Sequence, residues 1–256
     1  DCDVTVEESG PLRACVRVEG WYVSQKGERF CKFLVRVYTF AGSSIVKAQH
    51  TFIYTGYPEN KQHYLYKGKR LPKNETIDAV YLRWPAAIPD KGAFTFGTDA
   101  EIIQGMLGGR VELSQKAADN YELKQDGRVI KSGRRIKGWF DVDTTDGGMT
   151  IGVRNSWQQF PKAFIVDRNK GYIELHLWPA AAGALDLKTT EAALGPDSVA
   201  RGSAFGLAKT HDIFIYPHKA GYDESLAENV AEGLLSDILI APDPAWVAAT
   251  RVLGRV

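Results

Sequence analysis

The sequence predicts an all-β protein, built as a large sandwich of two antiparallel sheets with a few short helices. Three observations predict this fold class. Long runs at 13–24, 29–40 and 44–56 are rich in Val, Ile, Tyr, Phe and Thr, the residue types enriched in strands. The segments between them, QKGE and AGSS, are typical of hairpin turns. Helical patterns are sparse. Because the chain has many strands and little helix, the strands are expected to stack as two sheets.

Further strand patterns follow along the chain. They lie at 77–84, 92–97, 121–133, 137–142, 148–155, 163–167, 171–179 and 206–217. The segment 121–133 is predicted to be a hairpin around Asp126-Gly127, a dipeptide that favours tight turns. Residues 180–203 are small, polar and interrupted by Gly and Pro, which predicts a long connection rather than core.

Helix is expected in three short pieces. They are 156–162, 223–235 and 244–254. The second begins with Asp223, a good N-cap residue. We therefore divide the chain into a β-sandwich domain at 1–222 and a helical exit segment at 223–256, which is expected to lead towards a further domain.

Composition and charge narrow the classes of function. The formal net charge is +1, which gives no electrostatic footprint for nucleic acid or an anionic membrane. No apolar run approaches the roughly 18 residues of a membrane span. Neither nucleic acid nor membrane is therefore expected as a partner. The opening residues are polar, without the apolar core of a signal peptide, so localisation is not predicted from them.

Cysteine and histidine spacing predicts no metal site. Cys2, Cys15 and Cys31 show no CxxC or Cys/His spacing, which argues against a structural zinc site and a disulfide framework. Cys15 and Cys31 lie on consecutive strand patterns and could pair, but free thiols are the favoured interpretation. The five histidines do not reach metal-ligand spacing on any one element. Motifs of serine hydrolases, nucleotide-binding loops and zinc peptidases are absent from the sequence.

The stretch RNSWQQFPK, residues 154–162, concentrates hydrogen-bonding groups at a strand end. Sugar hydroxyls pair with amides and cations, and an apolar sugar face packs on an indole ring. The candidate substrate-binding residues are Asn155, Trp157, Gln158, Gln159 and Lys162, with Arg154 as a partner for a carboxylate. A sandwich corner, in which Trp157 fills the core and the amides cap loose backbone, explains the residues equally well.

Titratable residues gather on two other strand patterns. The segment 206–214 carries Lys209 and His211, either of which could act as a base or neutralise a carboxylate. His50 lies in the middle of a strand and shares a face with Phe52, so it faces either the core or a cleft. The alternative for each histidine is an ordinary strand residue satisfied by its neighbours.

The strand YIELHLWP supplies further candidates. Alternation predicts Glu174, His176 and Trp178 on one face, which suits a sugar site but also a polar edge face. His63 and His218 have no supporting context and are interpreted as surface residues.

Five blocks of sequence resemble a known family. They are VTVEESGPLRACVRVEGWYV, HTFIYTG, GMTIGVRNSWQQFPKAF, ELHLWPA and GLAKTHDIFIY. In this order they resemble the exo-acting rhamnogalacturonan lyase and YetA-like family, from about residue 4 to residue 218 and least over 57–135. The resemblance implies a central β-sandwich of the large, galactose-mutarotase-like kind (a super-sandwich). It also implies a preceding β-domain and a following α/α toroid as partners within one polypeptide.

The resemblance further implies an activity and a substrate. The family releases an unsaturated disaccharide from rhamnogalacturonan I by β-elimination, so the expected partner is a polysaccharide or oligosaccharide. No cofactor is expected, and a divalent cation, which lyases can use, has no visible ligand set. Secretion or a periplasmic location is marginally favoured for a polysaccharide degrader.

β-Elimination can be matched to the candidate residues. The reaction removes the proton on C5, next to the uronate carboxylate, and expels the sugar at O4. Donors must stabilise the charge that develops on the carboxylate; Arg154, Asn155, Gln158 and His211 are available. The candidate bases that this chain offers are Lys162, Lys209, His50 and His211. A neighbouring domain could also supply the base, so the isolated domain is expected to be inactive.

Two other functions stay open at this point. A mutarotase-like epimerase would use His176 and Glu174. A structural or carbohydrate-binding domain would need no base, and it predicts that Arg154 and His211 are locked into internal salt bridges.

Overall fold

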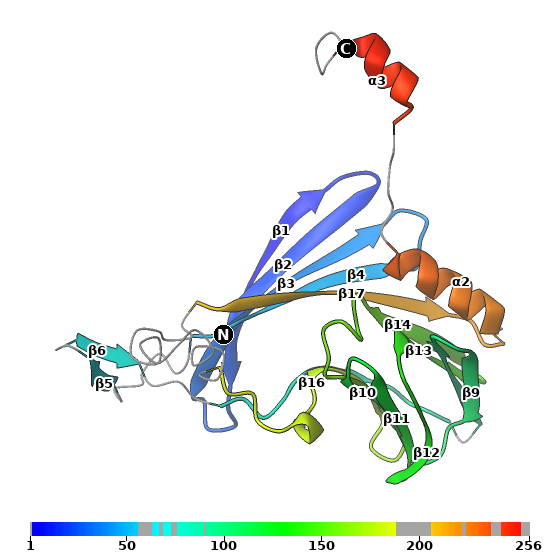
Figure 1. Ribbon diagram of the computed structural model, residues 1–256, viewed down its shortest axis with the longest axis horizontal. Helices are drawn as coiled ribbons and strands as arrows, with labels where there is room; N and C mark the ends of the chain where they lie inside the picture. Colours follow the sequence, from blue (N-terminus) through cyan, green and yellow to red (C-terminus); the bar gives the residue numbers. More distant parts are fainter. Residues whose placement is uncertain are drawn as a thin grey trace.

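Two antiparallel sheets make up most of the described structure and stack face to face (Figure 1). The computed structural model describes residues 2–55, 63–66, 69–72, 76–89, 91–187, 206–221, 224–236 and 242–251, with the backbone alone over 63–66 and 69–72. The larger sheet has nine strands in the order β1-β2-β3-β4-β17-β14-β13-β8-β9. These strands are β1 (Cys2–Ser9), β2 (Arg13–Val23), β3 (Arg29–Phe40), β4 (Val46–Ile53), β8 (Gly92–Thr98), β9 (Ile102–Met106), β13 (Ile136–Thr144), β14 (Gly147–Val153) and β17 (Ala208–His218).

The smaller sheet has six strands in the order β12-β11-β10-β15-β16-β7. They are β7 (Val80–Pro85), β10 (Arg110–Ala117), β11 (Asn120–Gln125), β12 (Arg128–Gly133), β15 (Lys162–Asp167) and β16 (Tyr172–Trp178). A separate hairpin is formed by β5 (His63–Tyr66) and β6 (Lys69–Pro72). The predicted all-β, two-sheet antiparallel sandwich is thus confirmed.

The core forms where alternate residues of both sheets meet. Phe140 of β13 stacks on Phe94 of β8, with ring centroids 5.8 Å apart, and on Phe164 of the opposite sheet at 5.9 Å. Aromatic contacts at this distance add to the stabilisation that burial already provides. This ladder of rings ties the two sheets together and holds β15 in register against the larger sheet.

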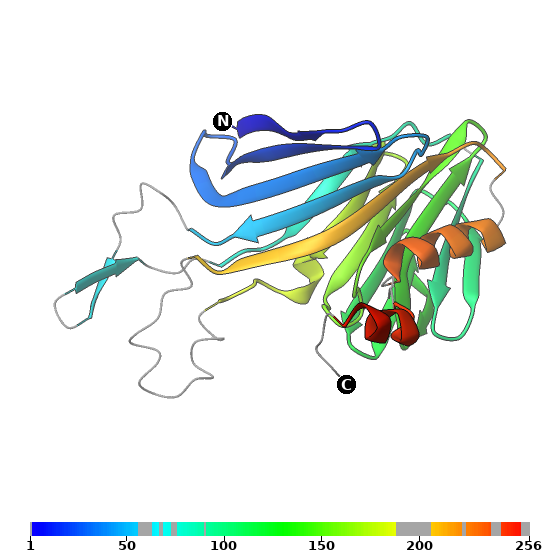
Figure 2. The ribbon, with the colours of Figure 1, turned by 90° about the horizontal axis from the view of Figure 1, so that it is seen from above.

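Helix α2 (Glu224–Leu235) lies on the outer face of the larger sheet, across β14 and β13 (Figure 2). Ala227 and Ala231 pack against the fully buried Trp139. Small residues on this side of the helix let it approach the sheet closely. A second helix, α3 (Pro244–Thr250), lies within the predicted range 244–254 and begins with proline after the N-cap Asp243. Asp223 and residues 252–254 of the predicted helices lie outside the described residues.

The predicted helix at 156–162 is wrong. Residues 154–159 form turns instead, with one i→i+4 bond, from the Gln159 amide to the Asn155 carbonyl at 2.9 Å. Asn155 has a left-handed φ of 56°, which breaks helical geometry at the start. Pro161 has no N–H to continue a helix, and β15 begins directly after it. In the connection predicted at 180–203, a short 3-10 helix η1 (Ala180–Ala182) is present, and 188–203 lies outside the described residues.

Strands β1, β2 and β3 rise away from the smaller sheet (Figure 1). Their inner face carries two rows of cross-strand valines that pair in register. The rows are Val4–Val18–Val35 and Val6–Val16–Val37. Val4 and Val6 on the edge strand are 65% and 63% exposed. The inner face of this overhanging part is therefore apolar and open to solvent at its edge.

Some expectations about individual side chains are confirmed and others are wrong. Cys2, Cys15 and Cys31 are free thiols, as favoured from their spacing. His218 was expected at the surface, but its side chain is 2% exposed and contacts Asp141 at 3.1 Å. The side chain of His63 lies outside the described part of the chain. No helix in that described part is long and apolar enough to cross a membrane.

Candidate functional site

A pocket of about 440 Å³ opens at one end of the sandwich, between the two sheets. Its apolar floor includes Phe52, Leu177 and Trp178. Gln158 and Gln159, from the turn after β14, form part of its polar wall. An apolar pocket with a few convergent polar groups is the usual form of a small-molecule or sugar site.

Two histidines stand side by side next to this pocket. His50 of β4 and His211 of β17 are directly paired across the strands, so their side chains share the inner face. Burial lowers the pKa of His50 to about 4. Burial, together with the nearby ammonium groups of Lys162 and Lys209, lowers the pKa of His211 to about 3. Both imidazoles are therefore neutral at pH 7.

Tyr22 of β2 orients the first of these histidines. Its hydroxyl lies 2.8 Å from His50 Nε2. Burial raises the pKa of Tyr22, so the hydroxyl keeps its proton. The Nδ1 atoms of His50 and His211 have no hydrogen-bond partner within the described residues.

Lys162 is the third titratable group of the cluster. It is the first residue of β15 and points into the sandwich, where it is 2% exposed. Its Nζ donates to the carbonyl oxygens of Gln159 and of Pro161, the latter at 3.2 Å. Burial, with a smaller contribution from the Lys209 ammonium, lowers the pKa of Lys162 to about 8. A fraction of this amine is therefore neutral near pH 7, which is what a general base requires.

The pocket thus brings together six of the residues predicted from the sequence. They are Gln158, Gln159, Lys162, Trp178, Lys209 and His211. His50 lies directly beside them through its pairing with His211. The group comes from two sheets and from segments more than a hundred residues apart, which only the stacking of β15 against β4 and β17 makes neighbours.

Arg154 lies elsewhere, on the outer face of the larger sheet. Its guanidinium donates to the carbonyl of Leu234 at 3.2 Å and to that of Ser236 at 3.3 Å. It also lies 5.2 Å from the centre of the Phe214 ring. Free carbonyls at a helix C-terminus attract cations. Arg154 therefore anchors the C-terminal end of α2 and does not line the pocket.

Asn155 and Trp157 also point away from the pocket lining. Asn155 is an exposed turn residue that accepts the Gln159 amide at its carbonyl. The Trp157 ring is covered by the guanidinium of Arg135, 4.0 Å from its centre. The polar stretch 154–162 is therefore divided among the outer face, the corner and the pocket.

His176 and Glu174 form a separate cluster on the outer face of the smaller sheet. His176 Nε2 lies 2.8 Å from Glu174, and Arg83 pairs with the same carboxylate at 2.6 Å. The His176 ring stacks on Tyr81 at 4.8 Å. A register shift between His176 and Trp178 breaks the predicted alternation, so Trp178 turns to the pocket instead of sharing their face.

Several pocket residues had no signal in the sequence. Leu185 and Leu187 line the pocket from inside the connection predicted at 180–203, and Tyr22, which contacts His50 beside the pocket, has the pattern of an ordinary strand aromatic. No group of three or more His, Cys, Asp or Glu side chains that could hold a metal ion occurs among the residues that the structure describes. The absence of a cofactor stays a prediction.

Comparison with known protein families identifies the family of this chain. The family model described as "PcRGLX-like protein central beta sandwich domain" matches residues 2–65 and 109–230, well over half of the chain. The chain belongs to this family. The matched ranges of the PcRGLX-like central sandwich contain His50, Lys162, Lys209 and His211. The resemblance to a central β-sandwich of the rhamnogalacturonan lyase-like and YetA-like group is confirmed.

One curated relative is much longer than this chain. The chain is 23% identical over 298 residues to the uncharacterized protein YetA of Bacillus subtilis (strain 168). The match takes in 97% of this chain and 34% of YetA, so the chain spans about a third of that relative's length.

Two solved structures are similar to this chain at low identity. A putative aldose 1-epimerase from Klebsiella pneumoniae has a TM-score of 0.43 and 12% identity, over 93% of this chain and 59% of its own. The galactosidase domain of the α-galactosidase–sucrose kinase AgaSK has a TM-score of 0.47 and 9% identity, over 87% and 28%.

Proposed function

We propose that this domain forms the catalytic wall of a polysaccharide lyase that cleaves a uronate-containing glycan, of the rhamnogalacturonan I kind, by β-elimination. One observation carries the proposal. A buried lysine with a pKa of about 8 lies at an apolar pocket beside two neutral histidines. Lowered pKa values gathered in a cleft are typical of catalytic sites, because burying such groups without a use only destabilises the fold.

Lys162 is the proposed base. Its neutral amine takes the C5 proton of the uronate and becomes an ammonium ion. The electron pair of the C5–H bond forms the C4–C5 double bond, and the C4–O4 bond breaks. The leaving oxygen accepts a proton from water, and the hydroxide left behind takes the proton of the Lys162 ammonium, which restores the neutral amine. The apolar floor of the pocket favours the neutral form of Lys162 before the reaction.

The remaining pocket residues bind the sugar. The Lys209 ammonium offsets the uronate carboxylate as negative charge spreads onto it from C5. The Gln158 amide hydrogen-bonds hydroxyl groups, and the Trp178 indole packs on an apolar sugar face. His211 lines the same pocket, and its buried Nδ1 has no hydrogen-bond partner in the described part of the chain. These roles require no cofactor.

The two alternative functions, a structural domain and an epimerase, predict different contacts for the candidate residues. A structural domain predicts internal salt bridges at Arg154 and His211. Arg154 does serve the fold, through α2, but His211 makes no ion pair within the described residues and lines the pocket. A mutarotase-like epimerase would use Glu174 and His176, yet Arg83 already neutralises that carboxylate and neither residue lines the pocket.

The test uses the full-length natural polypeptide that contains this domain. It is incubated with rhamnogalacturonan I, and the ultraviolet absorbance of the unsaturated uronate product is followed. Lys162→Met removes the base at similar length and is expected to lower kcat at least a hundredfold. The matched control is Lys131→Met on β12, an exposed lysine paired with Glu101 at 2.8 Å, which should leave kcat unchanged. A Lys162→Met enzyme that is folded and as fast as wild type would refute the assignment.

A further inference from the structure

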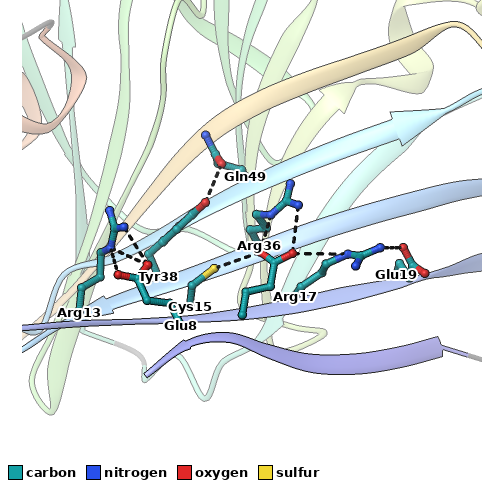
Figure 3. Close-up of polar contacts among 9 residues, drawn as sticks. Glu8, Arg13, Cys15, Arg17, Glu19, Arg36, Tyr38 and Gln49 are labelled. Carbon is teal, nitrogen blue, oxygen red and sulfur yellow. Dashed lines mark hydrogen bonds and ion pairs between the residues drawn. The ribbon is translucent and has the colours of Figure 1, made fainter. Parts of the chain in front are cut away.

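The outer face of β1–β4 carries a ladder of polar side chains that mostly satisfy one another (Figure 3). Arg36 donates to Glu7 at 2.7 Å, and Arg13 to Glu8 at 2.8 Å. The Tyr38 hydroxyl donates to Gln49 at 3.1 Å. Because these side chains bond one another, this part of the solvated sheet face offers few polar groups to a ligand.

One end of this ladder is different, because a groove of about 480 Å³ opens there. Its lining includes Asp3, Glu19, Trp21, Lys32 and Ile53. The strand register places these five on one face, with Asp3 opposite Glu19, Trp21 opposite Lys32, and Lys32 opposite Ile53. The groove therefore crosses all four strands on the outer side of the sheet.

Polar groups in this groove are available to a ligand. The Asp3 carboxylate and the Trp21 indole N–H make no hydrogen bond within the described residues. The Lys32 ammonium makes no ion pair there and lies 4.9 Å from the centre of the Trp21 ring. An exposed cation over a ring is held weakly, so a ligand can displace it or share it.

This set of groups fits an uncharged, hydroxyl-bearing ring. The indole offers an apolar platform, the Asp3 carboxylate accepts from hydroxyl groups, and the Lys32 ammonium donates to ring or hydroxyl oxygens. Carboxylates and cations are both present, so the groove has no strong excess of one sign that would select an anion. A neutral pyranose satisfies the platform, the acceptors and the donors together.

We propose that this groove is a second glycan-binding site, which takes neutral pyranose units of the polysaccharide. It is separate from the catalytic pocket. Phe52 lines the pocket and the next residue, Ile53, lines the groove, so the two sites lie on opposite faces of the same strands. The site holds a polymer chain near the pocket without contacting the bond that is cleaved. The identity of the polysaccharide rests on the function proposed above.

The test measures binding and turnover by the full-length polypeptide. Affinity for soluble rhamnogalacturonan I is determined by titration calorimetry. Trp21→Ala is expected to weaken binding about tenfold or more, as truncation of a central aromatic contact does. Trp246→Ala on α3, where the tryptophan is 63% exposed, is the matched control and should bind as wild type. Asp3→Asn removes an exposed carboxylate without a change in packing and should also weaken binding.

Turnover separates an anchoring site from the catalytic pocket. Trp21→Ala should lower kcat/KM on the polymer and leave it unchanged on the shortest oligosaccharide that is cleaved. Native binding of the polymer by folded Trp21→Ala and Asp3→Asn would overturn the inference. If the wild type makes no unsaturated product but its polymer binding still depends on Trp21, the lyase proposal fails and the groove stands. Product formation with binding that is indifferent to Trp21 gives the reverse result.

Discussion

Replacing Lys162 with Met should stabilise the domain at neutral pH while it removes the proposed base. Lowering the lysine pKa from 10.5 to about 8 means that holding the charged amine in the fold costs about 3 kcal/mol. The substitution removes this cost. It also removes two hydrogen bonds, to the carbonyls of Gln159 and Pro161, each contributing about 1 kcal/mol. The free energy of unfolding should therefore rise by about 1 kcal/mol at pH 7.

The sign of this effect should change with pH. Because the folded pKa lies below the unfolded one, wild type gains stability as pH rises from about 8 to 10.5. Above that range the cost of the charge is gone and only the hydrogen bonds count. The variant should then be less stable than wild type by about 2 kcal/mol. Urea unfolding of both 256-residue chains at pH 7 and near pH 10.5 measures the difference.

The comparison between the two chains cancels the other lysines and tyrosines that titrate in this range. A stability difference between variant and wild type that does not change with pH would refute the buried, charge-strained amine and, with it, the argument for a base. Lys131→Met serves as the control, because its exposed ammonium should contribute little at either pH.

Four further substitutions test separate contacts. His211→Gln should reduce the loss of stability in acid. The pKa of His211 is lowered to about 3 in the fold, so wild type loses stability as pH falls below about 6.5. Urea midpoints of the variant and wild type at pH 7 and pH 5 measure this loss. His218→Gln should act oppositely. Burial alone would lower the pKa of His218, but the hydrogen bonds of its ring to Asp141 and to the Lys219 carbonyl raise it. Wild type therefore gains stability from these hydrogen bonds in acid and loses that stability as pH rises through the pKa of His218. Arg154→Met should release the end of α2 and speed hydrogen exchange over 224–236 without lowering kcat. Gly138→Ala, at a φ of +92° with a new Cβ 2.8 Å from the Val153 carbonyl, should cost about 1–3 kcal/mol, read as a lower Tm.

Strand content was predictable because most strands carry their pattern locally. β1, β5, β6, β9 and β10 were not predicted, and β10 (Arg110–Ala117) shows why a local pattern can fail. It was missed because the alternation of Val111 and Leu113 stops at Gln115, which occupies the next inward position. The fully buried Gln115 is tolerated in the core because its side chain bonds the Ala117 and Arg134 carbonyls and the Ile136 amide. Two of these partners, Arg134 and Ile136, lie 19 and 21 residues away in the sequence, and alternation alone cannot reveal them.

The residues of the site were predicted by type, but their grouping was not. Arg154 and Lys162 stand eight positions apart in one polar stretch, and this proximity suggested a single wall. The strand before the turn sends Arg154 to the outer face, whereas β15 turns Lys162 inward. The pairing of His50 with His211 depends on β4 and β17 being neighbours, a crossover that no local pattern encodes. Catalytic and sugar-binding roles for these residues stay predictions.

The overhanging strands have a consequence for the behaviour of this domain in solution. β1 is an eight-residue strand at the edge of its sheet, where it pairs only with β2 among the described strands, and its valines face the same side as those of β2. An edge of this kind is a template for another chain. The bulge between Val6 and Glu8 disturbs the register at one point only. Concentrated preparations should therefore self-associate through β1, and Val6→Lys, at a position 63% exposed, should keep them monomeric at no expense to the core.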